Sequence, residues 1–438
     1  MSSGTEIVAE EKPQPQASSG LAFAVGFFFS FRAVIVLFSV RVLGTDPRVG
    51  AEANLALNFL LLGLVGFASL GSGKRTFGSM VRLRSIQWVF VFLVFSGCSL
   101  AWSVTAALPT SVVYWCGMAA DAAMVFLLLR AGTVTTVAHS LMKGFIWSTC
   151  CLALLVWIMP AQADLRLGDQ DFFNTNQIGN LCAFSIFMAQ YLMRRKDGKW
   201  GVATAFLAVT LLRSLSKTTL VAFLLSEGYL VIQDRSISRK TKIYLTAALV
   251  VFILAFWGLF EAYYGIYTNT YNQAETLTGR TGIWFVCLNE ALDKPWIGHG
   301  FDSIWKVIPP FGDEQFEARH AENEVLQQFY AYGVAGIVAL TGLYWSLYWQ
   351  IRKLQRGQVR IVFLSLMLFI VIRGLAEAEP FDLTLPLWAI VLISVLLASG
   401  NEIGYDTAPL LPSAGVGQAS PASSQRSVVL SAHNETDS

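Results

Sequence analysis

Charged residues are scarce in this sequence. Only 14% of the 438 residues are Asp, Glu, Lys or Arg, whereas 55% are hydrophobic and the mean hydropathy is +0.54. This composition excludes an ordinary soluble domain and indicates a protein that crosses a membrane several times. The net charge of only +2 gives no sign of a nucleic-acid partner, and we expect none.

Cysteine is also rare. All but one of the 6 cysteines lie inside apolar runs, and Cys287 stands alone, so their spacing predicts neither a disulfide framework nor a zinc site. Residues 1–20 are polar and lack the basic start and cleavage site of a signal peptide. We therefore expect disordered cytoplasmic segments at 1–20 and at the Ser-, Ala-, Pro- and Gly-rich residues 400–438.

Apolar runs fill residues 21–399 and predict one all-α polytopic membrane domain with about twelve transmembrane helices. If the N-terminus is cytoplasmic, the loops on the cytoplasmic side hold most of the Lys and Arg, as the positive-inside rule requires. Both termini are then cytoplasmic. The predicted spans are 21–43, 54–70, 86–102, 111–129, 144–159, 177–193, 201–212, 218–232, 243–263, 325–350, 359–372 and 383–399.

One polar interval, at about 264–324 between the ninth and tenth predicted helices, is much longer than the other loops. On the orientation above it faces outward, into the periplasm of a Gram-negative cell. Ordering a long loop costs entropy, and loops of this kind usually carry function, so we expect the active site here. Within it, 280–292 has an amphipathic helical pattern, with one face against the membrane surface or the helix bundle. The residues of that face are Ile283, Trp284, Cys287 and Ala291.

Basic residues are few on the predicted outer side, so each of them needs an explanation. Singly, each could pair with a carboxylate or extend to lipid headgroups. Together, cations at helix ends would bind a pyrophosphate, because the guanidinium fork matches phosphate oxygens. Pyrophosphates on that side occur mainly on polyprenyl lipid carriers. The residues concerned are Arg213, Lys217, Arg280, Arg319 and Arg373.

His320 and Glu322 are the candidate proton acceptors, because they lie directly before the apolar run that begins at residue 325. The alternatives are a loop histidine bonded to backbone and a carboxylate favoured by the dipole of the following helix. Asp169 and Asp171 resemble the acidic pair of metal-dependent glycosyl transferases. Two loop carboxylates are more often solvated charge, so we expect no metal.

Three ionisable residues, Arg32, Asp121 and Glu227, fall inside predicted spans. A charge is costly in lipid, so each should face the interior of the bundle, either paired or lining a wet cavity. The sequence does not assign their partners.

Several of these motifs together resemble the O-antigen ligase and polymerase superfamily, over about residues 165–340. Two short pieces come first, Asn176-Gln177-Ile178-Gly179 and Leu215-Ser216-Lys217-Thr218. Then follow Gly279-Arg280-Thr281-Gly282-Ile283-Trp284, Pro295, Gly298, Gly300, Phe301, His320-Ala321-Glu322-Asn323-Glu324-Val325-Leu326-Gln327, and Gly333 to Gly336. The order and spacing of these pieces carry the resemblance.

The resemblance implies a GT-C-like membrane glycosyltransferase domain over 21–399, working at the outer face of the bacterial inner membrane without cofactor. Its donor would be a glycan on undecaprenyl pyrophosphate. Arg280 would contact the pyrophosphate leaving group, and His320 or Glu322 would take the proton of the acceptor hydroxyl. Pyrophosphate or glycan would be bound by Lys217, Arg213, Arg319, Arg373 and Asn176, although the segment around Asn176 could instead cap its helix.

The sequence departs from the family pattern at two positions. Lys217 replaces the usual Arg, which keeps the charge but loses the bidentate fork. Glu322 stands where many members have a second histidine, so the base is either His320, oriented by Glu322, or Glu322 itself. We favour His320, because its unperturbed pKa lies near neutrality.

Three functions remain. A polymerase would join lipid-linked repeat units into a surface polysaccharide, with membrane lipids around it and a chain-length regulator as a further partner. A ligase would move the glycan to lipid A-core or to a protein. A glycan transporter would require internal repeats and helices broken at the midplane, and neither is evident. The form of the Ser216-Lys217-Thr218 motif and the chain length favour the polymerase.

Overall fold

The structure is a computed structural model, and it describes residues 16–70, 77–159, 167–168, 174–255, 277–308, 318–379 and 381–403. All regular elements in these residues are α-helices, which confirms the all-α class. They are α1 (Gln16–Arg41), α2 (Pro47–Leu70), α3 (Phe77–Val81), α4 (Arg84–Ser99), α5 (Leu108–Ala131), α6 (Val134–Ile158), α7 (Thr175–Arg194), α8 (Gly201–Ser214), α9 (Lys217–Gln233), α10 (Arg239–Ala255), α12 (Leu277–Asp293), α13 (Glu324–Lys353), α14 (Gln358–Gly374) and α15 (Leu387–Ile403).

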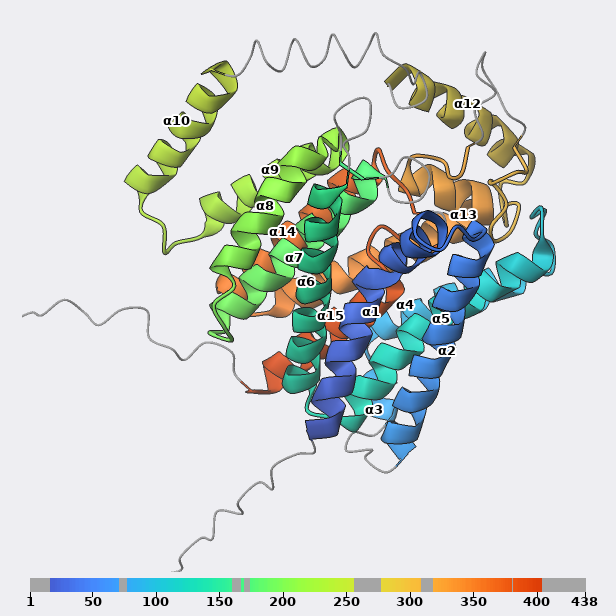
Figure 1. The fold of residues 1–438 in the computed structure, drawn as a ribbon, viewed down its shortest axis with the longest axis horizontal. Coiled ribbons are helices and arrows are strands. Elements are labelled where there is room, and N and C mark those ends of the chain that lie inside the picture. The colour runs from blue at the N-terminus through green and yellow to red at the C-terminus, as the bar shows by residue number, and fades with distance from the viewer. Residues whose placement is uncertain are drawn as a thin grey trace, which may run out of the picture.

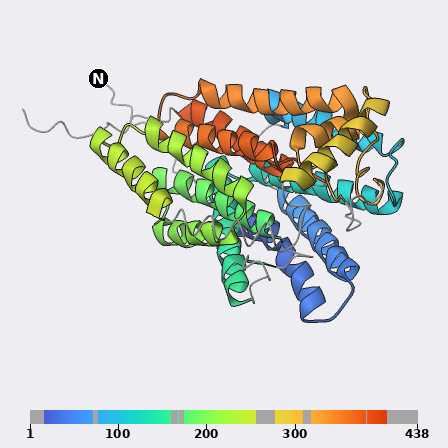
Figure 2. The ribbon, with the colours of Figure 1, turned by 90° about the horizontal axis from the view of Figure 1, so that it is seen from above.

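Most of the described helices pack into one bundle (Figures 1 and 2), α12 lies beside it near the start of α13, and α10 stands apart from the bundle in Figure 1. Five of them, α1, α2, α5, α6 and α13, are long and apolar enough to cross a membrane. The protein is therefore a multi-pass membrane protein, while the number of twelve spans stays a prediction. The start of α1 and the end of α15 both lie toward the lower end of Figure 1.

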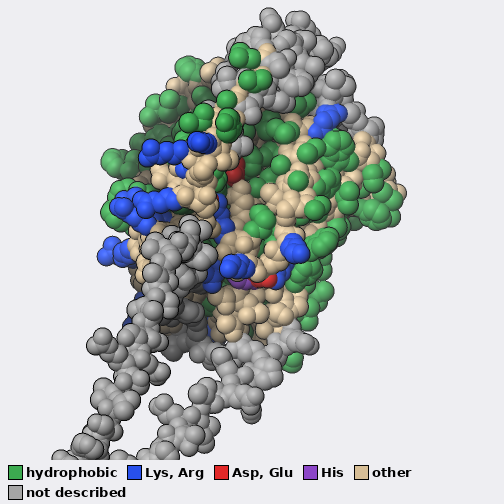
Figure 3. Space-filling model, turned by 90° about the vertical axis from the view of Figure 1, so that its left-hand side faces the viewer, with side chains coloured by type: hydrophobic (Ala, Val, Ile, Leu, Met, Phe, Trp, Pro, Cys, Tyr) green, Lys and Arg blue, Asp and Glu red, His purple; other side chains and the backbone are tan. Residues whose placement is uncertain are grey.

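The surface of the bundle is strongly apolar. Large side chains such as Phe67, Ile158 and Val202 keep 80% or more of their surface exposed, which suits contact with lipid acyl chains. Figure 3 shows one side of the molecule, where hydrophobic side chains cover the flanks and several Lys and Arg side chains gather on the surface between them.

Helices α1 and α6 pack backbone against backbone. A Cβ atom added at Gly26 would lie 2.0 Å from the carbonyl oxygen of Leu141, and one added at Gly144 would lie 2.0 Å from that of Phe23. Small residues commonly allow such close approach between membrane helices.

The ionisable residues inside the membrane are paired, as expected. Arg32 of α1 binds the carboxylate of Asp121 of α5 with both terminal nitrogens, and Asn58 of α2 donates to the same carboxylate. Glu227 of α9 accepts a hydrogen bond of 2.8 Å from Gln190 of α7. The bundle therefore supplies partners for charges that would be costly in lipid.

Helix α13 is broken at Gly333, whose φ of 63° and ψ of −153° are non-helical. The segment 295–301 binds at the break through four backbone hydrogen bonds of 2.7–3.2 Å. The N–H groups of residues 334 and 335 donate to the carbonyls of residues 295 and 296, respectively. In the other direction, the N–H groups of residues 299 and 300 donate to the carbonyls of residues 330 and 331. Gly298 is needed there, because its φ is +65° and an added Cβ would lie 2.4 Å from the backbone of Ala331. The glycine-rich part of the motif therefore joins the long loop to a membrane helix.

Candidate active site

Helix α12 positions Arg280, the central residue of the site. The buried face of this helix, formed by Ile283, Cys287 and Ala291, packs in a small core with Tyr330 of α13. This confirms the amphipathic segment and decides that its apolar face lies against the bundle. Arg280, in the first turns of α12, is thereby held at the end of the bundle where α13 begins.

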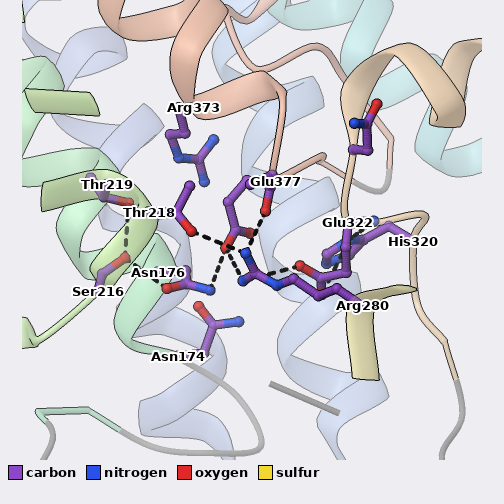
Figure 4. Close-up of polar contacts among 12 residues, drawn as sticks. Asn174, Asn176, Ser216, Thr218, Thr219, Arg280, His320, Glu322, Arg373 and Glu377 are labelled. Carbon is purple, nitrogen blue, oxygen red and sulfur yellow. Dashed lines mark hydrogen bonds and ion pairs between the residues drawn. The ribbon is translucent and has the colours of Figure 1, made fainter. Parts of the chain in front are cut away.

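The Arg280 guanidinium joins four segments of the chain (Figure 4). Its Nη1 donates to Thr218 Oγ1 of α9 at 3.0 Å and to the Ala376 carbonyl at 2.7 Å, and its Nη2 donates to Glu377 Oε1 at 2.7 Å. Its Nη2 also lies 3.5 Å from Glu322 Oε2. Arg280 thus connects α12, α9, the α14–α15 loop and the segment before α13.

Asn176 of α7 belongs to the same network. Its Nδ2 donates to Glu377 Oε1 at 2.7 Å, and its Oδ1 accepts from Ser216 Oγ at 2.7 Å. Gly179 allows this approach, because an added Cβ would lie 3.2 Å from Ser216 Cβ. The side chain that caps α7 is Asn174, which accepts from the N–H of residue 177 at 2.9 Å. The Asn176 side chain is therefore available to the site, where the segments 176–179 and 215–218 contact each other.

Glu377 was not singled out by the sequence analysis. It is buried and accepts from both Arg280 and Asn176 on one oxygen. Burial and the nearby Glu322 charge raise the pKa of Glu377 to about 7, against the opposing effect of Arg373, Arg280 and His320. The signal that could have found it is the pair of carboxylates at 377 and 379, a few residues after Arg373.

The side chains of His320 and Glu322 lie close together. His320 Nδ1 lies 3.7 Å from Glu322 Oε1 and accepts a hydrogen bond of 3.3 Å from the Glu322 backbone N–H. Glu322 has a φ of 51°, which is uncommon for a residue other than glycine. Burial lowers the pKa of His320, with only partial compensation from Glu377 and Glu379. His320 is therefore mainly neutral at pH 7 and able to accept a proton.

Arg373, at the end of α14, lies beside Thr218 and Glu377 (Figure 4). Its residue exposure is 1%, and one terminal nitrogen lies 3.1 Å from Glu379 Oε1. Its Nε and Nη1 are buried and have no hydrogen-bond partner among the described residues. Buried donors of this kind call for an explanation, and an anionic ligand is one that satisfies them.

The remaining predicted cations lie at the end of α8, at the start of α9 and in the segment before α13. Arg213 is half-buried at the end of α8, while Lys217 and Arg319 are exposed. Each has interactions of its own, and none of the contacts described above involves them. Lys217 directly precedes Thr218, a partner of Arg280, so it lies near the network. Their roles stay predictions, and Asp169 and Asp171 lie outside the described residues.

The fold and the site thus define a multi-pass membrane protein with cationic and acidic side chains gathered at one end of its bundle. Residues 202–341 match the family model described as O-antigen ligase. This stretch includes α9, α12 and Glu322, and the match confirms the resemblance to the O-antigen ligase and polymerase superfamily. That family implies glycan transfer from a lipid-linked donor to an acceptor. The chain matches none of the curated proteins that were searched.

Proposed function

We propose that the protein transfers a glycan from undecaprenyl pyrophosphate to an acceptor hydroxyl at the outer face of the bacterial inner membrane. In this proposal it polymerises the repeat units of a surface polysaccharide. The observation that carries the proposal is the network around Arg280, which meets Glu322 and Glu377 beside the buried, partly unpartnered guanidinium of Arg373.

The two guanidinium groups suit a diphosphate leaving group. As the acceptor oxygen bonds to the anomeric carbon, the bond from that carbon to the diphosphate oxygen breaks. The electron pair of that bond leaves with undecaprenyl diphosphate. Arg280 and Arg373 would offset the negative charge that builds on the diphosphate, and burial strengthens such electrostatic stabilisation.

The acceptor proton goes to His320 in this proposal. His320 Nδ1 accepts a hydrogen bond from the Glu322 backbone N–H and lies 3.7 Å from Glu322 Oε1. The neutral ring therefore carries its proton on Nε2, and Nδ1 is the proton acceptor. The lowered pKa of His320 keeps the ring neutral before the reaction. Glu322 then orients the ring and stabilises the imidazolium that forms.

A ligase that moves the glycan to lipid A-core or protein is the second candidate. The description of the matching family model favours it. The two functions share donor chemistry and differ in the acceptor, so the donor network described above supports both equally. The form of the Ser216-Lys217-Thr218 motif is our reason for placing the polymerase first.

Complementation separates the candidates. Arg280, His320 and Glu322 are replaced singly by Ala in a strain lacking the chromosomal copy, and surface and carrier-linked glycans are compared on gels at matched protein levels. Arg356→Ala, an exposed residue between α13 and α14, is the control.

Single repeat units on the carrier or acceptor in the three variants would support a polymerase. Long chains that stay on the carrier would show a ligase instead. Wild-type glycan from all three variants would refute the catalytic assignment and make transport the leading hypothesis.

A further inference from the structure

The Glu377 carboxylate contacts two of the residues expected to bind the donor. Its Oε1 accepts from Arg280 Nη2 at 2.7 Å and from Asn176 Nδ2 at 2.7 Å (Figure 4). The two donors come from α12 and α7, which are far apart in the sequence. A single oxygen atom on the α14–α15 loop therefore fixes the relative positions of two donor-site side chains.

Both guanidinium groups of the site contact carboxylates. Arg280 lies against Glu377 and, at 3.5 Å, Glu322, while Arg373 lies 3.1 Å from Glu379. A carboxylate and a phosphate present similar charged oxygens to a guanidinium. A diphosphate oxygen that binds Arg280 Nη2 would therefore take the place of the Glu377 carboxylate.

We propose that Glu377 is a positioning residue that competes with the donor diphosphate for Arg280, holds Arg280 and Asn176 in place, and releases them to the lipid-linked donor. This inference rests on the proposed function. After transfer, Glu377 returns to Arg280 and so competes with the product diphosphate, which promotes product release.

The contacts of Arg280 fit such an exchange. Its Nη1 keeps two acceptors that do not involve the Glu377 side chain, Thr218 Oγ1 and the Ala376 carbonyl. Arg280 can thus stay in place while only the Nη2 bond passes from Glu377 to a phosphate oxygen. Glu377 lies in the non-helical segment after α14, whereas Arg280 and Asn176 lie on helices, so the loop is the side that moves more easily.

The electrostatics of Glu377 support the exchange as well. Burial and Glu322 raise its pKa to about 7, while Arg280, Arg373 and His320 act in the opposite direction. When a diphosphate binds Arg280 in place of Glu377, the Glu377 carboxylate loses its contact with that guanidinium and gains the negatively charged diphosphate as a neighbour. A proton can then neutralise Glu377 near neutral pH, which lowers the cost of leaving it buried.

The test uses the purified full-length protein in detergent with farnesyl diphosphate as a short polyprenyl diphosphate probe. Glu377→Gln keeps the shape and an acceptor oxygen for Arg280 and Asn176 but removes the competing charge. We expect it to bind the probe about tenfold more tightly than the wild type, the size of one charge-assisted hydrogen bond. Glu290→Gln, which removes an exposed carboxylate from the same end of the molecule, is the control and should bind as the wild type does.

Turnover of the lipid-linked donor provides the second readout. For Glu377→Gln we expect KM for the donor and kcat to fall together, because the product diphosphate leaves more slowly. If Glu377 acted as a catalytic base, Glu377→Gln would instead lower kcat without changing the affinity for the probe. A merely structural role would lower thermal stability and leave probe binding weaker or unchanged. Either result overturns the inference.

The same titration separates this inference from the proposed function. If the wild type does not bind the probe, or if Arg280→Ala binds it as tightly as the wild type, the diphosphate site itself is wrong and both proposals fall. If Arg280→Ala weakens binding but Glu377→Gln does not strengthen it, only the role of Glu377 is refuted.

Discussion

Replacing Gly333 by Ala should detach the long loop from the bundle and disable the site. Gly333 has a φ of 63° and a ψ of −153°, a combination essentially restricted to glycine. A Cβ atom there would lie 2.5 Å from the carbonyl oxygen of Pro295 and 2.5 Å from the carbonyl carbon of Trp296. These are backbone atoms, so no side-chain rotation relieves the contact, and segment 295–301 must move.

The size of the effect follows from the contacts at the break. Four backbone hydrogen bonds join segment 295–301 to α13, and each contributes about 1 kcal/mol. Forcing Ala into the backbone conformation of Gly333 costs about 1–3 kcal/mol. Together these terms set an upper limit of about 7 kcal/mol on the destabilisation of the native arrangement. A straightened α13 would recover part of this by forming its own helical hydrogen bonds, so we expect helix content to be retained while the loop is released.

The released loop should affect activity through Glu322. Glu322 directly precedes Asn323, the cap of α13, and lies 3.5 Å from Arg280. Straightening α13 moves this carboxylate, and a displacement of about 1 Å in a positioned group can cost on the order of a hundredfold in rate.

The assays are glycan production in the complemented strain, at matched protein levels, and limited proteolysis of the purified protein. The control is Gly66→Ala in α2, where an added Cβ meets no atom within 4 Å. The reasoning is refuted if Gly333→Ala makes wild-type glycan and resists protease as the wild type does.

Two further predictions concern single charges. Arg280→Lys should lower glycan transfer at least about tenfold in the same assay, because one ammonium group cannot reproduce the planar fork that meets three acceptors; full activity would show that charge alone suffices. Asp121→Asn should lower the melting temperature in detergent by several degrees, since it leaves Arg32 without its buried counter-charge at a cost of about 3 kcal/mol. An unchanged melting temperature would show that this ion pair contributes no net stability.

Much of the fold and part of the site could be predicted from the sequence. The apolar runs indicate a helical membrane protein because a bilayer requires long stretches whose backbone is satisfied internally, and such stretches are visible along the chain. The amphipathic pattern around Ile283 and Cys287 could also be predicted, because helical periodicity is a local property of the sequence, and the structure confirmed it. His320 and Glu322 could be proposed together as candidate proton acceptors because they lie close in sequence, directly before the apolar run that begins at residue 325.

Contacts between distant segments could not be predicted in this way. Glu377 lies 201 residues from Asn176 and 97 from Arg280, and no local pattern shows that these side chains share one oxygen. The pairing of Arg32 with Asp121, 89 residues apart, likewise depends on how α1 packs against α5.

The sequence by itself therefore determined the membrane class, the resemblance to the O-antigen ligase and polymerase superfamily, and the choice of Arg280, His320 and Glu322 as candidates. Hydropathy, helical periodicity and the order of motifs are properties of the linear sequence, so they can be recognised without a structure. Only the tertiary structure decided that Gly298 and Gly333 join a loop to a broken helix, and that Glu377 contacts both Arg280 and Asn176. These roles arise from close approach between segments, which depends on packing in three dimensions.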